Sequence, residues 1–491
     1  MKKLIISFII MLTATTAVIA QNEVDALRFS RLQYGGSARY WGLGGAYGAV
    51  GADFSALSTN PAGMGLFKRS EISFTPTFTG AKSSATFYGT TTDDSKSSFN
   101  IGNLGVVFVI DNPNSNSGSD WKNFQFGFGY NRLANFNSRY LIKGTNTKSS
   151  LLGKYKEWAD GNAPDNLNAY DTKLAFDANL LYRPDLTRNI YSADVLDPIN
   201  FPGIDQMKTI STTGYMGETV FSGSGNYQDK IYFGASLGIL SLRYDETTNY
   251  TESDKANRIP AVKGVKFNSF DKYESLLLRG TGYNLKLGVI VRAADWLRLG
   301  AAVHTPALFS KVNYDYNTSI ASYLTPTNYG STQAATVYST TFDLTTPLKL
   351  IGSAAFIIGK SGLISVDYEM VDYSKARFQP SVDYTLENQR IKDKYQSTSN
   401  IRVGGEYRVG QISLRGGYGI FGSPYKSNVN DGKGTLASLG IGYRTADYYV
   451  DCAYTNYKMA EDYYLYGGDP ANSASLKSTT NMFMVTFGLK F

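Results

Sequence analysis

The sequence predicts an all-β protein, a transmembrane antiparallel β-barrel of about 14 strands whose lumen is plugged by an N-terminal hatch. Three observations support this prediction. From Glu71 onward, apolar residues alternate with polar residues or glycine in segments of strand length. Short turns and long polar loops alternate between these segments, which is the connectivity of an outer-membrane barrel. A compact glycine-rich stretch precedes the first segment and is suited to fill the lumen.

The composition of the 491-residue chain agrees with a barrel that crosses a membrane. The chain contains 49 glycines, 37 tyrosines and 27 phenylalanines, and only 18% of its residues are charged. No long apolar run follows the N-terminal segment, so apolar helices cannot span a bilayer, whereas alternating strands can. The net charge of +7 is scattered without a basic stripe, which excludes nucleic acid as a partner.

Residues 1–20 have the features of a secretory signal peptide. Two lysines precede an apolar core from Leu4 to Met11, and a small-residue tail ends at Ala20, so we expect the mature chain to begin at Gln21. The single cysteine, Cys452, excludes an intrachain disulfide and a cysteine metal cluster. We therefore expect no metal and no cofactor.

Residues 21–69 are predicted to form the hatch, and its centre is the stretch Trp41–Phe67. Glycines recur there among small residues, at positions 42, 44, 45, 48 and 51. At this density the backbone can approach other backbone closely and adopt positive φ. A dinucleotide-binding loop is not indicated, because Tyr47 stands where the third glycine is needed. A flexible linker is not indicated either, since the aromatic and aliphatic residues of the stretch favour burial.

Residues 70–491 are predicted to form the barrel. The long loops lie at about 144–214, 250–270, 317–336, 378–397, 422–433 and 459–478. We assign the short turns to the periplasm, which places both chain termini there and makes the large insertion at about 144–214 extracellular. The final strand ends on Phe491, a terminal aromatic that resembles the signal by which barrel-assembly machinery recognises its clients.

Four motifs of the hatch, together with the signal peptide, the strand pattern and the terminal phenylalanine, resemble the FadL/TodX (OMPP1-like) family of outer-membrane transporters. The motifs are Leu43–Ala46, Gly51–Asp53, Ser55–Leu57 and Asn60–Gly63. The resemblance implies a non-enzymatic channel for passive uptake of long-chain fatty acids or aromatic hydrocarbons, with a hatch gate and lateral release through a kinked strand. The hatch and gate residues that it implies are Gly44, Gly45, Asp53, Asn60, Pro61, Ala62 and Gly63.

The same resemblance implies a location and partners. We expect a multi-pass protein in the outer membrane of a Gram-negative bacterium. We expect a monomer that contacts outer-membrane lipid and lipopolysaccharide and takes a hydrophobic small molecule as its substrate.

An apolar ligand needs an apolar path, because a polar lumen does not dissolve it. The hatch aromatics Tyr47, Phe54 and Phe67 are the candidate ligand contacts. They have an alternative role, since each ring could simply anchor the hatch in the barrel.

The third strand, Trp121 to Lys143, is the candidate site of a lateral opening. If the phenylalanines of this strand face lipid, the same period places Arg132 on the lipid face. An arginine near mid-membrane costs about 2–4 kcal/mol, and the cost falls towards zero at the interface. Either Arg132 therefore lies at the interface, or the wall is broken there and Asn131, Arg132 and Phe136 border a lateral gap.

Five arginines beside short turns are predicted to face the lumen and ring its periplasmic end: Arg292, Arg298, Arg408, Arg415 and Arg444. Their candidate partners are Glu406, Asp367 and Asp451. This ring is either a salt-bridge network that stabilises barrel and hatch, or an electrostatic landing site for a ligand carboxylate.

Functions other than transport have less support in the sequence. His304 is the only histidine, and no serine motif or orienting group accompanies it, so an enzyme is not indicated. Its expected role is that of a hydrogen-bonded lumen residue. Two alternatives remain open: a general porin or haem receptor, and a non-transporting barrel that is a docking partner for secreted or surface proteins. Ion conductance, haem binding or co-purification of a protein distinguishes them.

Overall fold

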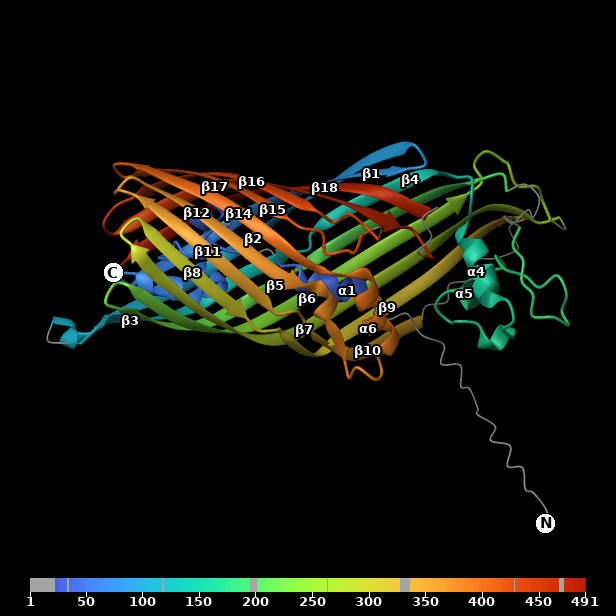
Figure 1. The fold of residues 1–491 in the computed structure, drawn as a ribbon. Helices are drawn as coiled ribbons and strands as arrows, with labels where there is room; N and C mark the ends of the chain where they lie inside the picture. Colours follow the sequence, from blue (N-terminus) through green and yellow to red (C-terminus); the bar gives the residue numbers. More distant parts are fainter. Residues whose placement is uncertain are drawn as a thin grey trace, which may run out of the picture.

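The protein is a closed β-barrel with helices inside its lumen, as the computed structural model shows (Figure 1). The structure describes residues 23–32, 35–116, 119–194, 201–262, 264–326, 336–427, 429–467 and 472–491. The expected signal peptide, residues 1–20, and the expected mature start at Gln21 lie outside these residues.

Eighteen strands form one antiparallel sheet within the described residues. They are β1 (Glu71–Phe87), β2 (Thr90–Asp111), β3 (Trp121–Asn135), β4 (Ser138–Asn146), β5 (Ile204–Tyr227), β6 (Ile231–Ser253), β7 (Lys266–Ala294), β8 (Leu297–His304), β9 (Leu308–Thr325), β10 (Thr336–Thr345), β11 (Lys349–Ile358), β12 (Gly362–Asp372), β13 (Arg377–Gln379), β14 (Ser397–Val409), β15 (Ile412–Phe421), β16 (Gly434–Arg444), β17 (Tyr448–Tyr464) and β18 (Ser473–Lys490).

These strands make up 14 spans around the barrel, because four spans each consist of two consecutive strands. β3 and β4 both pair with β5, and β8 and β9 both pair with β7. The next two spans are β10 with β11, and β12 with β13. In the first of them, β11 pairs with β8 on one side and β12 on the other, and β10 pairs with β9 and β13 in the same way. β1 pairs with both β2 and β18, which closes the barrel. The predicted fold class is confirmed.

Proline and a local turn explain three of the four interruptions. Pro306 separates β8 from β9 and Pro347 separates β10 from β11, and each lacks the backbone N–H that a ladder needs. The 3₁₀ helix η4 (Tyr373–Lys375) separates β12 from β13, and the Asp372 side chain accepts a hydrogen bond from the Ser374 amide at its start. These three interrupted spans are neighbours in the sheet.

The strands extend further towards the long loops than the hydropathy pattern predicts. β5, β6 and β7 contain 24, 23 and 29 residues, so the large insertion covers 147–203 instead of 144–214. Near the long loops both faces of these strands are polar, for example along residues 247–249. Alternation of hydropathy ends there, whereas the hydrogen-bonded ladder continues. The predicted third strand, Trp121 to Lys143, is also two strands, β3 and β4.

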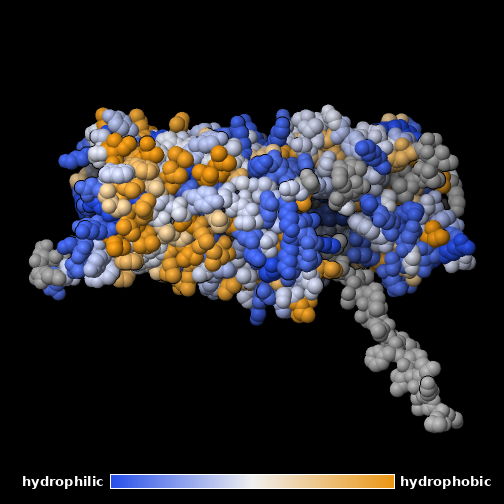
Figure 2. Space-filling view, viewed as in Figure 1, coloured by the Kyte–Doolittle hydropathy of each residue, from blue (hydrophilic) through white to orange (hydrophobic). Residues whose placement is uncertain are grey.

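Outward-facing apolar side chains form a belt around one half of the barrel. Phe126, Leu285 and Leu439 on three different strands are 55%, 52% and 69% exposed. Figure 2 shows apolar residues gathered over the half of the barrel nearer the C-terminus, with mostly polar residues over the other half. Such a band is the surface that a barrel presents to lipid acyl chains.

The helices lie in the N-terminal segment and in the loops. The N-terminal ones are α1 (Glu23–Ser30), α2 (Ala38–Gly42), α3 (Ala56–Thr59) and the 3₁₀ helix η1 (Pro61–Leu66). The large insertion contains α4 (Leu151–Ala159), η3 (Pro164–Asn166) and α5 (Thr172–Asp177), and other loops contain η2 (Pro113–Asn116), η4 and α6 (Thr385–Lys394). None of the described helices is long and apolar enough to cross a membrane.

The described residues between 23 and 67 form a plug inside the lumen. α2 packs against β15 to β18 and η1 packs against β5, β6 and β7, so the plug spans the lumen from one wall to the other. The Ser37 side chain caps α2 by accepting from the Tyr40 amide, and Asn60 accepts from Ala62 at the start of η1. Between them Gly44 has a φ of +64°, a conformation that lets the chain turn back after α2.

Glycines of the wall make room for the plug backbone. A Cβ atom on Gly404 of β14 would collide with the carbonyl oxygen of Leu43, and one on Gly417 of β15 would collide with the Gly44 amide. On the opposite side, a Cβ atom on Gly234 of β6 would collide with Pro61. The plug is therefore held by direct backbone contact with the wall, which only glycine permits at these positions.

The two ends of the described chain lie at different places in the barrel. The Phe491 amide donates to the Ser70 carbonyl at 3.0 Å, at the short-turn end. Glu23, the first described residue, instead contacts the loop that contains α6: Lys394 Nζ lies 2.5 Å from its carboxylate, and the Tyr395 hydroxyl donates to its carbonyl at 3.0 Å. α1 therefore runs up the lumen towards a long loop, and the chain's own N-terminus lies outside the described residues.

Replacing Gly404 by alanine tests the fit of the plug. We expect a loss of about 1–3 kcal/mol in the free energy of unfolding, because the added methyl group meets backbone that cannot rotate away. The measurement is the temperature at which the barrel loses its folded mobility in SDS gel electrophoresis. The matched control is Gly405→Ala on the same strand, where a Cβ atom meets only ordinary contact with the Leu363 carbonyl at 3.8 Å. Equal melting of the two variants contradicts the prediction.

Candidate functional site

A cavity of about 410 Å³ lies in the lumen between the plug and the barrel wall, and we call it the lumen cavity. Its wall includes α1 with the residues that follow it, the stretch 132–140 of the third span, polar residues of β1, β2 and β18 such as Thr79, Asn100 and Thr480, and aromatic residues of the facing strands and loops. These aromatic residues are Tyr244, Tyr373, Phe421, Tyr425, Tyr457 and Tyr463. Such a wall suits an apolar or amphipathic small molecule.

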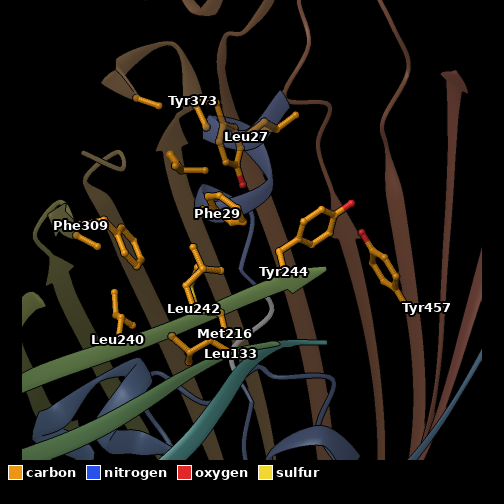
Figure 3. Close-up of a cluster of buried hydrophobic side chains, with 14 of the residues drawn as sticks. Leu27, Phe29, Leu133, Met216, Leu240, Leu242, Tyr244, Phe309, Tyr373 and Tyr457 are labelled. Carbon is orange, nitrogen blue, oxygen red and sulfur yellow. The ribbon is translucent and has the colours of Figure 1, made fainter. Parts of the chain in front are cut away.

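α1 brings the plug into the wall of this cavity. Leu27 and Phe29 are buried, and Figure 3 shows both side chains among residues of the barrel wall. The centroid of the Phe29 ring lies 6.2 Å from that of Phe136 and 6.5 Å from that of Tyr244, and the latter two are 5.5 Å apart. These three rings join the plug, the third span and β6 at one side of the cavity.

The lumen cavity carries more positive than negative charge. The cationic side chains in its wall are Arg28, Arg31, Lys82, Arg132 and Arg139, and the carboxylates are Glu246 and Glu461. Arg28 and Arg139 are paired with Asp25 and Asp94, which are not lining residues, so a small excess of positive charge remains and favours an acidic ligand.

Arg28 and Arg31, one helical turn apart, differ in their partners. Arg28 forms an ion pair with Asp25 and lies 4.0 Å from the centroid of the Tyr244 ring. Burial raises the pKa of Asp25 to about 6, although Arg28 lowers it, so this carboxyl is ionised at neutral pH. Arg31 donates to the Gly432 carbonyl at 2.6 Å and forms no ion pair with a carboxylate of the described residues. Its charge is therefore available to an acidic ligand.

Beside this cavity, two neighbouring spans of the barrel wall are not joined by backbone hydrogen bonds. The ladder between β2 and β3 runs from the pair Asp111 and Asn123 to the pair Asn103 and Asn131, and ends there. Residues 90–102 of β2 pair with β1, and the rest of the third span pairs with β5. We call the boundary between residues 90–102 and residues 132–146 the seam.

Side chains, not backbone pairs, bridge the seam. Asn135 Nδ2 donates to Ser98 Oγ at 3.2 Å, and Lys96 Nζ donates to the Thr212 carbonyl of β5 at 2.8 Å. From β1, Ser83 Oγ donates to the Arg139 carbonyl of β4 at 2.6 Å. These contacts can separate without breaking the rest of the sheet.

Irregular residues on both sides place the seam at this height. Pro76 of β1 lacks a backbone N–H and pairs with Ile101, and Gly102 of β2 is skipped between this pair and the pair of Thr75 with Asn103. On the other side Leu133 is skipped in the pairing of β3 with β5, and its side chain is buried in the core. Two bulges at one height turn the strands away from each other.

The predicted border residues lie at this boundary. Asn131 is the last residue in the ladder, and its side chain donates to Ser58 of the plug at 2.8 Å. Arg132 is half-buried beside the lumen cavity, with its guanidinium 5.0 Å from the centroid of the Tyr215 ring. Phe136 also borders the cavity, at the interruption between β3 and β4. The structure thus brings all three to one place.

The plug touches the seam directly. A Cβ atom on Gly35 would collide with the carbonyl oxygen of Arg132, and the Gly36 carbonyl lies 3.6 Å from the Cβ position of Gly102. The segment after α1 therefore contacts the bulge on both sides of the seam. A movement of this segment changes the contacts at the seam.

The predicted hatch residues hold the plug in its own shape. Asp53 is buried and accepts from Ser37 Oγ at 2.7 Å and from the Ser55 amide at 2.9 Å. Asn60 donates to the Gly48 carbonyl at 2.7 Å, and the Gly63 carbonyl accepts from the Ala52 amide at 2.9 Å. With Pro61 and Ala62 in the first turn of η1, and Gly44 and Gly45 at positive φ, these residues fix the turns of the plug.

The hatch aromatics lie away from the cavities. Tyr47, Phe54 and Phe67 are at most 4% exposed, and none of them lines the lumen cavity. The Phe54 ring occupies the space beside Gly105 and Gly129 of the wall. Sequence reasoning assigned them to ligand contact because exposed aromatics would suit an apolar path, but the wall covers their rings. The plug residues that line the cavity are in and just after α1, where Leu27 and Arg31 are four residues apart, a spacing that the sequence also contains.

The arginines of the predicted ring have different partners. Arg415 pairs with Glu406 and Asp451, both at 2.7 Å, and Arg444 pairs with Asp451 at 2.8 Å. Arg39 of the plug, which sequence reasoning missed, completes this group through Glu406 at 3.0 Å. We call Arg39, Glu406, Arg415, Asp451 and Arg444 the plug clamp, because it ties α2 to β14, β15, β16 and β17.

The other predicted arginines lie around or outside the plug clamp. Arg408 pairs with Glu406 from a partly exposed position, and Arg298 donates to the Val50 carbonyl of the plug at 3.1 Å. Arg292 lies opposite Arg298 in the ladder between β7 and β8, and its side chain pairs with Asp295 of the adjacent turn at 3.0 Å. Asp367, expected to pair with an arginine of the ring, accepts from the Tyr47 and Gly48 amides.

A second group fixes α3. Glu218 accepts from Lys286 and from Ser58 Oγ, and both members of the ion pair are buried. His304 Nε2 lies 2.7 Å from the Thr59 carbonyl, so the histidine is a hydrogen-bonded lumen residue as expected. The part of the chain that the structure describes contains no group of three histidine, cysteine or acidic residues able to hold a metal ion.

The fold and this site together define a class of plugged β-barrel in which a lumen cavity reaches a break in the wall. No protein-family model and no curated protein sequence matches the chain. Solved structures of this class do match, at low sequence identity. The fold of the chain is that of FadL- and TodX-type barrels.

Three of these structures show how far the likeness extends. A Pseudomonas aeruginosa FadL homologue is 13% identical, covers 94% of this chain and 99% of its own, and has a TM-score of 0.55. The P. putida toluene transporter TodX is 12% identical with coverages of 93% and 99% and a TM-score of 0.55. The Ralstonia pickettii toluene transporter TbuX is 14% identical, with coverages of 93% and 98% and a TM-score of 0.51.

Glu406→Gln tests the plug clamp. Removing the carboxylate leaves the buried Arg39 and Arg415 guanidinium groups undercompensated, and we expect a loss of about 3–5 kcal/mol in plug docking. The measurement is ion conductance in planar bilayers, which we expect to rise, together with trypsin cleavage within the plug. The control is Arg408→Gln, because this arginine side chain is 44% exposed. For it we expect an effect of at most about 1 kcal/mol. If Glu406→Gln changes neither the conductance nor the trypsin cleavage, Glu406 does not hold the plug in place.

Proposed function

We propose that the protein is an outer-membrane channel for passive uptake of hydrophobic small molecules. The lumen cavity is its binding site, the plug blocks the straight path through the barrel, and the seam is the exit into the membrane. The observation that carries the proposal is the continuity of these parts, since residues of α1, of the plug segment 35–36 and of the seam line one cavity. The likeness to toluene transporters supports the same class of substrate.

We further propose that the substrate is an amphipathic acid such as a long-chain fatty acid. The aromatic and aliphatic wall takes the hydrocarbon chain, and Arg31 takes the carboxylate. A neutral aromatic hydrocarbon would leave Arg31 without an ion pair, with only the Glu461 carboxylate of the same cavity to compensate its charge, which is less favourable. A general porin is less favoured, because the plug contacts opposite walls of the lumen.

Release sideways follows from the chemistry of the substrate. A hydrocarbon chain leaves an apolar cavity more readily into lipid than into water. The seam offers this path, because only side-chain contacts cross it, and the contact between Gly35 and Arg132 couples plug position to seam geometry. In this proposal the short turns face the periplasm of a Gram-negative bacterium, and the large insertion faces outward among lipopolysaccharide.

Arg31→Gln tests the acidic substrate. We expect stearate to bind about 10- to 100-fold more weakly, because a charged hydrogen bond to the carboxylate is lost, while toluene binding stays within about twofold. The measurement is native mass spectrometry of the purified barrel with each ligand. Arg188→Gln, in the insertion and 72% exposed at its side chain, is the control. Equal weakening of both ligands, or of neither, contradicts the role of Arg31.

A crosslink across the seam tests the exit. In a Cys452→Ser background, Ser98→Cys and Asn135→Cys place two thiols where the two side chains are hydrogen-bonded. We expect bridging by a short thiol-specific crosslinker to lower fatty-acid uptake by about tenfold or more, because the strands can no longer separate. A reducible crosslinker allows uptake to return when the bridge is cleaved.

The matched control for this crosslink joins strands that are already paired. Ser222→Cys and Ser236→Cys lie at directly opposite positions of β5 and β6, with the native hydroxyl oxygens 2.8 Å apart. We expect no change in uptake when this pair is bridged. Undiminished uptake with the seam closed shows that the substrate leaves by another path.

A further inference from the structure

A second cavity, of about 370 Å³, lies at the end of the barrel that carries the large insertion. We call it the outer cavity. α4 and the residues before α5 form its roof, and β5, β7, β9 and β10 supply wall residues. Sequence reasoning assigned no site to the insertion, and the proposed transport function does not use this cavity.

A cation–π contact separates the outer cavity from the lumen cavity. Lys208 lines the outer cavity, and its Nζ lies 5.1 Å from the centroid of the Tyr463 ring, which lines the lumen cavity. Lys208 Nζ also donates to the Leu465 carbonyl at 3.1 Å, so the side chain is fixed across the boundary. The two cavities therefore have separate walls and can bind different molecules.

The charges of the outer cavity are balanced, unlike those of the lumen cavity. Lys208 and Lys272 are matched by Asp171 and Glu274. Lys272 pairs with Glu274 at 2.9 Å, and the Tyr316 hydroxyl donates to the same carboxylate at 2.6 Å. Because the wall carries equal numbers of positive and negative side chains, it has no net charge that would favour an acidic ligand.

Aromatic rings and hydroxyl groups make up much of the remaining wall. The Tyr155 and Trp158 rings are 5.8 Å apart between centroids, and the Tyr170 ring lies 5.8 Å from Tyr338 and 6.3 Å from Tyr316. Rings of this kind present flat apolar faces together with polar edges. A ligand with both C–H faces and hydroxyl groups matches this wall.

One polar group in the wall lacks a partner. Tyr155 is 1% exposed, and its hydroxyl makes no hydrogen bond with the described residues, although Lys272 Nζ is close by, 5.7 Å from the centroid of the Tyr155 ring. Burial raises the pKa of Tyr155 to about 12, so the group keeps its proton at neutral pH and can donate. A buried hydroxyl without a partner is unfavourable, and a hydrocarbon in the cavity would leave it so. A hydroxylated ligand would satisfy it.

We infer that the outer cavity is a binding site for a neutral saccharide unit. The C–H face of the sugar ring stacks on Trp158, and its hydroxyl groups bond to the Tyr155 hydroxyl and to the Lys272 and Glu274 pair. A pocket with a mostly aromatic wall and a few convergent polar groups is typical of a small-molecule site, and its size falls in the usual range. The site does not depend on whether the lumen cavity transports fatty acids.

The test is titration of the protein in phosphatidylcholine nanodiscs that contain no glycoside detergent, since such a detergent could occupy the site. The probes are maltose, lactose and methyl glucoside, with toluene and stearate for comparison, and the readouts are calorimetry and tryptophan fluorescence. The variants are Tyr155→Phe, which removes only the unpartnered hydroxyl, and Trp158→Ala. The control is Leu186→Ala, in the same insertion and 76% exposed but not in the wall of the cavity.

We expect at least one of the sugars to bind and to quench or shift tryptophan fluorescence. We expect Trp158→Ala to weaken binding by about tenfold or more and Tyr155→Phe by about three- to tenfold, while Leu186→Ala leaves it unchanged. Stearate affinity should stay the same in both cavity variants. Three results overturn the inference: none of the three sugars binds, sugar binding survives both substitutions, or toluene and stearate bind in competition with the sugar.

Discussion

The structure depends on one constraint, that backbone amide and carbonyl groups in a membrane wall need partners because lipid supplies none. The ladder between β2 and β3 departs from this rule beyond Asn131. Side chains such as Asn135 and Lys96 span the opening, and the plug segment at Gly35 covers it from inside. A wall that is held by side chains can open where a paired wall cannot. In our proposal the substrate leaves through the seam, so the cavity, the plug and the exit all depend on the end of the backbone ladder at Asn131.

The plug must stay in place although it lies beside an opening. Buried charges hold it: the plug clamp fixes α2 through Arg39 and Glu406, and Glu218 with Lys286 fixes α3. Removing one member of a buried ion pair leaves an uncompensated charge, so such contacts are strong positioning devices even where their net stabilisation is small. α1 lies outside both groups and is held by other contacts: the Phe29 ring packs against Phe136 and Tyr244, and Glu23 pairs with Lys394 of α6.

The sequence was sufficient to predict the barrel, its 14 spans and the plug, because a period of two and a run of glycines each have few structural causes. The boundaries of the insertion were wrong by up to about ten residues, since ladders continue where hydropathy no longer alternates.

The partner of Arg39, Glu406, lies 367 positions away, and no local pattern reveals such a pair. Arg292 lies opposite Arg298 as its parity predicts, but its ion-pair partner, Asp295, belongs to the adjacent turn and was not predicted. The bulge at the seam, where Gly102 is skipped beside the pair of Pro76 with Ile101, is visible only once the register is known.

The most direct test of the proposed function is photolabelling with a stearate that carries a diazirine in its chain, applied to the protein in outer-membrane vesicles. Peptide mass spectrometry then identifies the residues that the chain reaches. Our proposal predicts labels in residues 132–140 of the third span and in α1, with the carboxylate end near Arg31. Labels confined to the short-turn end of the plug, near Phe67, would contradict lateral exit and indicate passage through the plug instead.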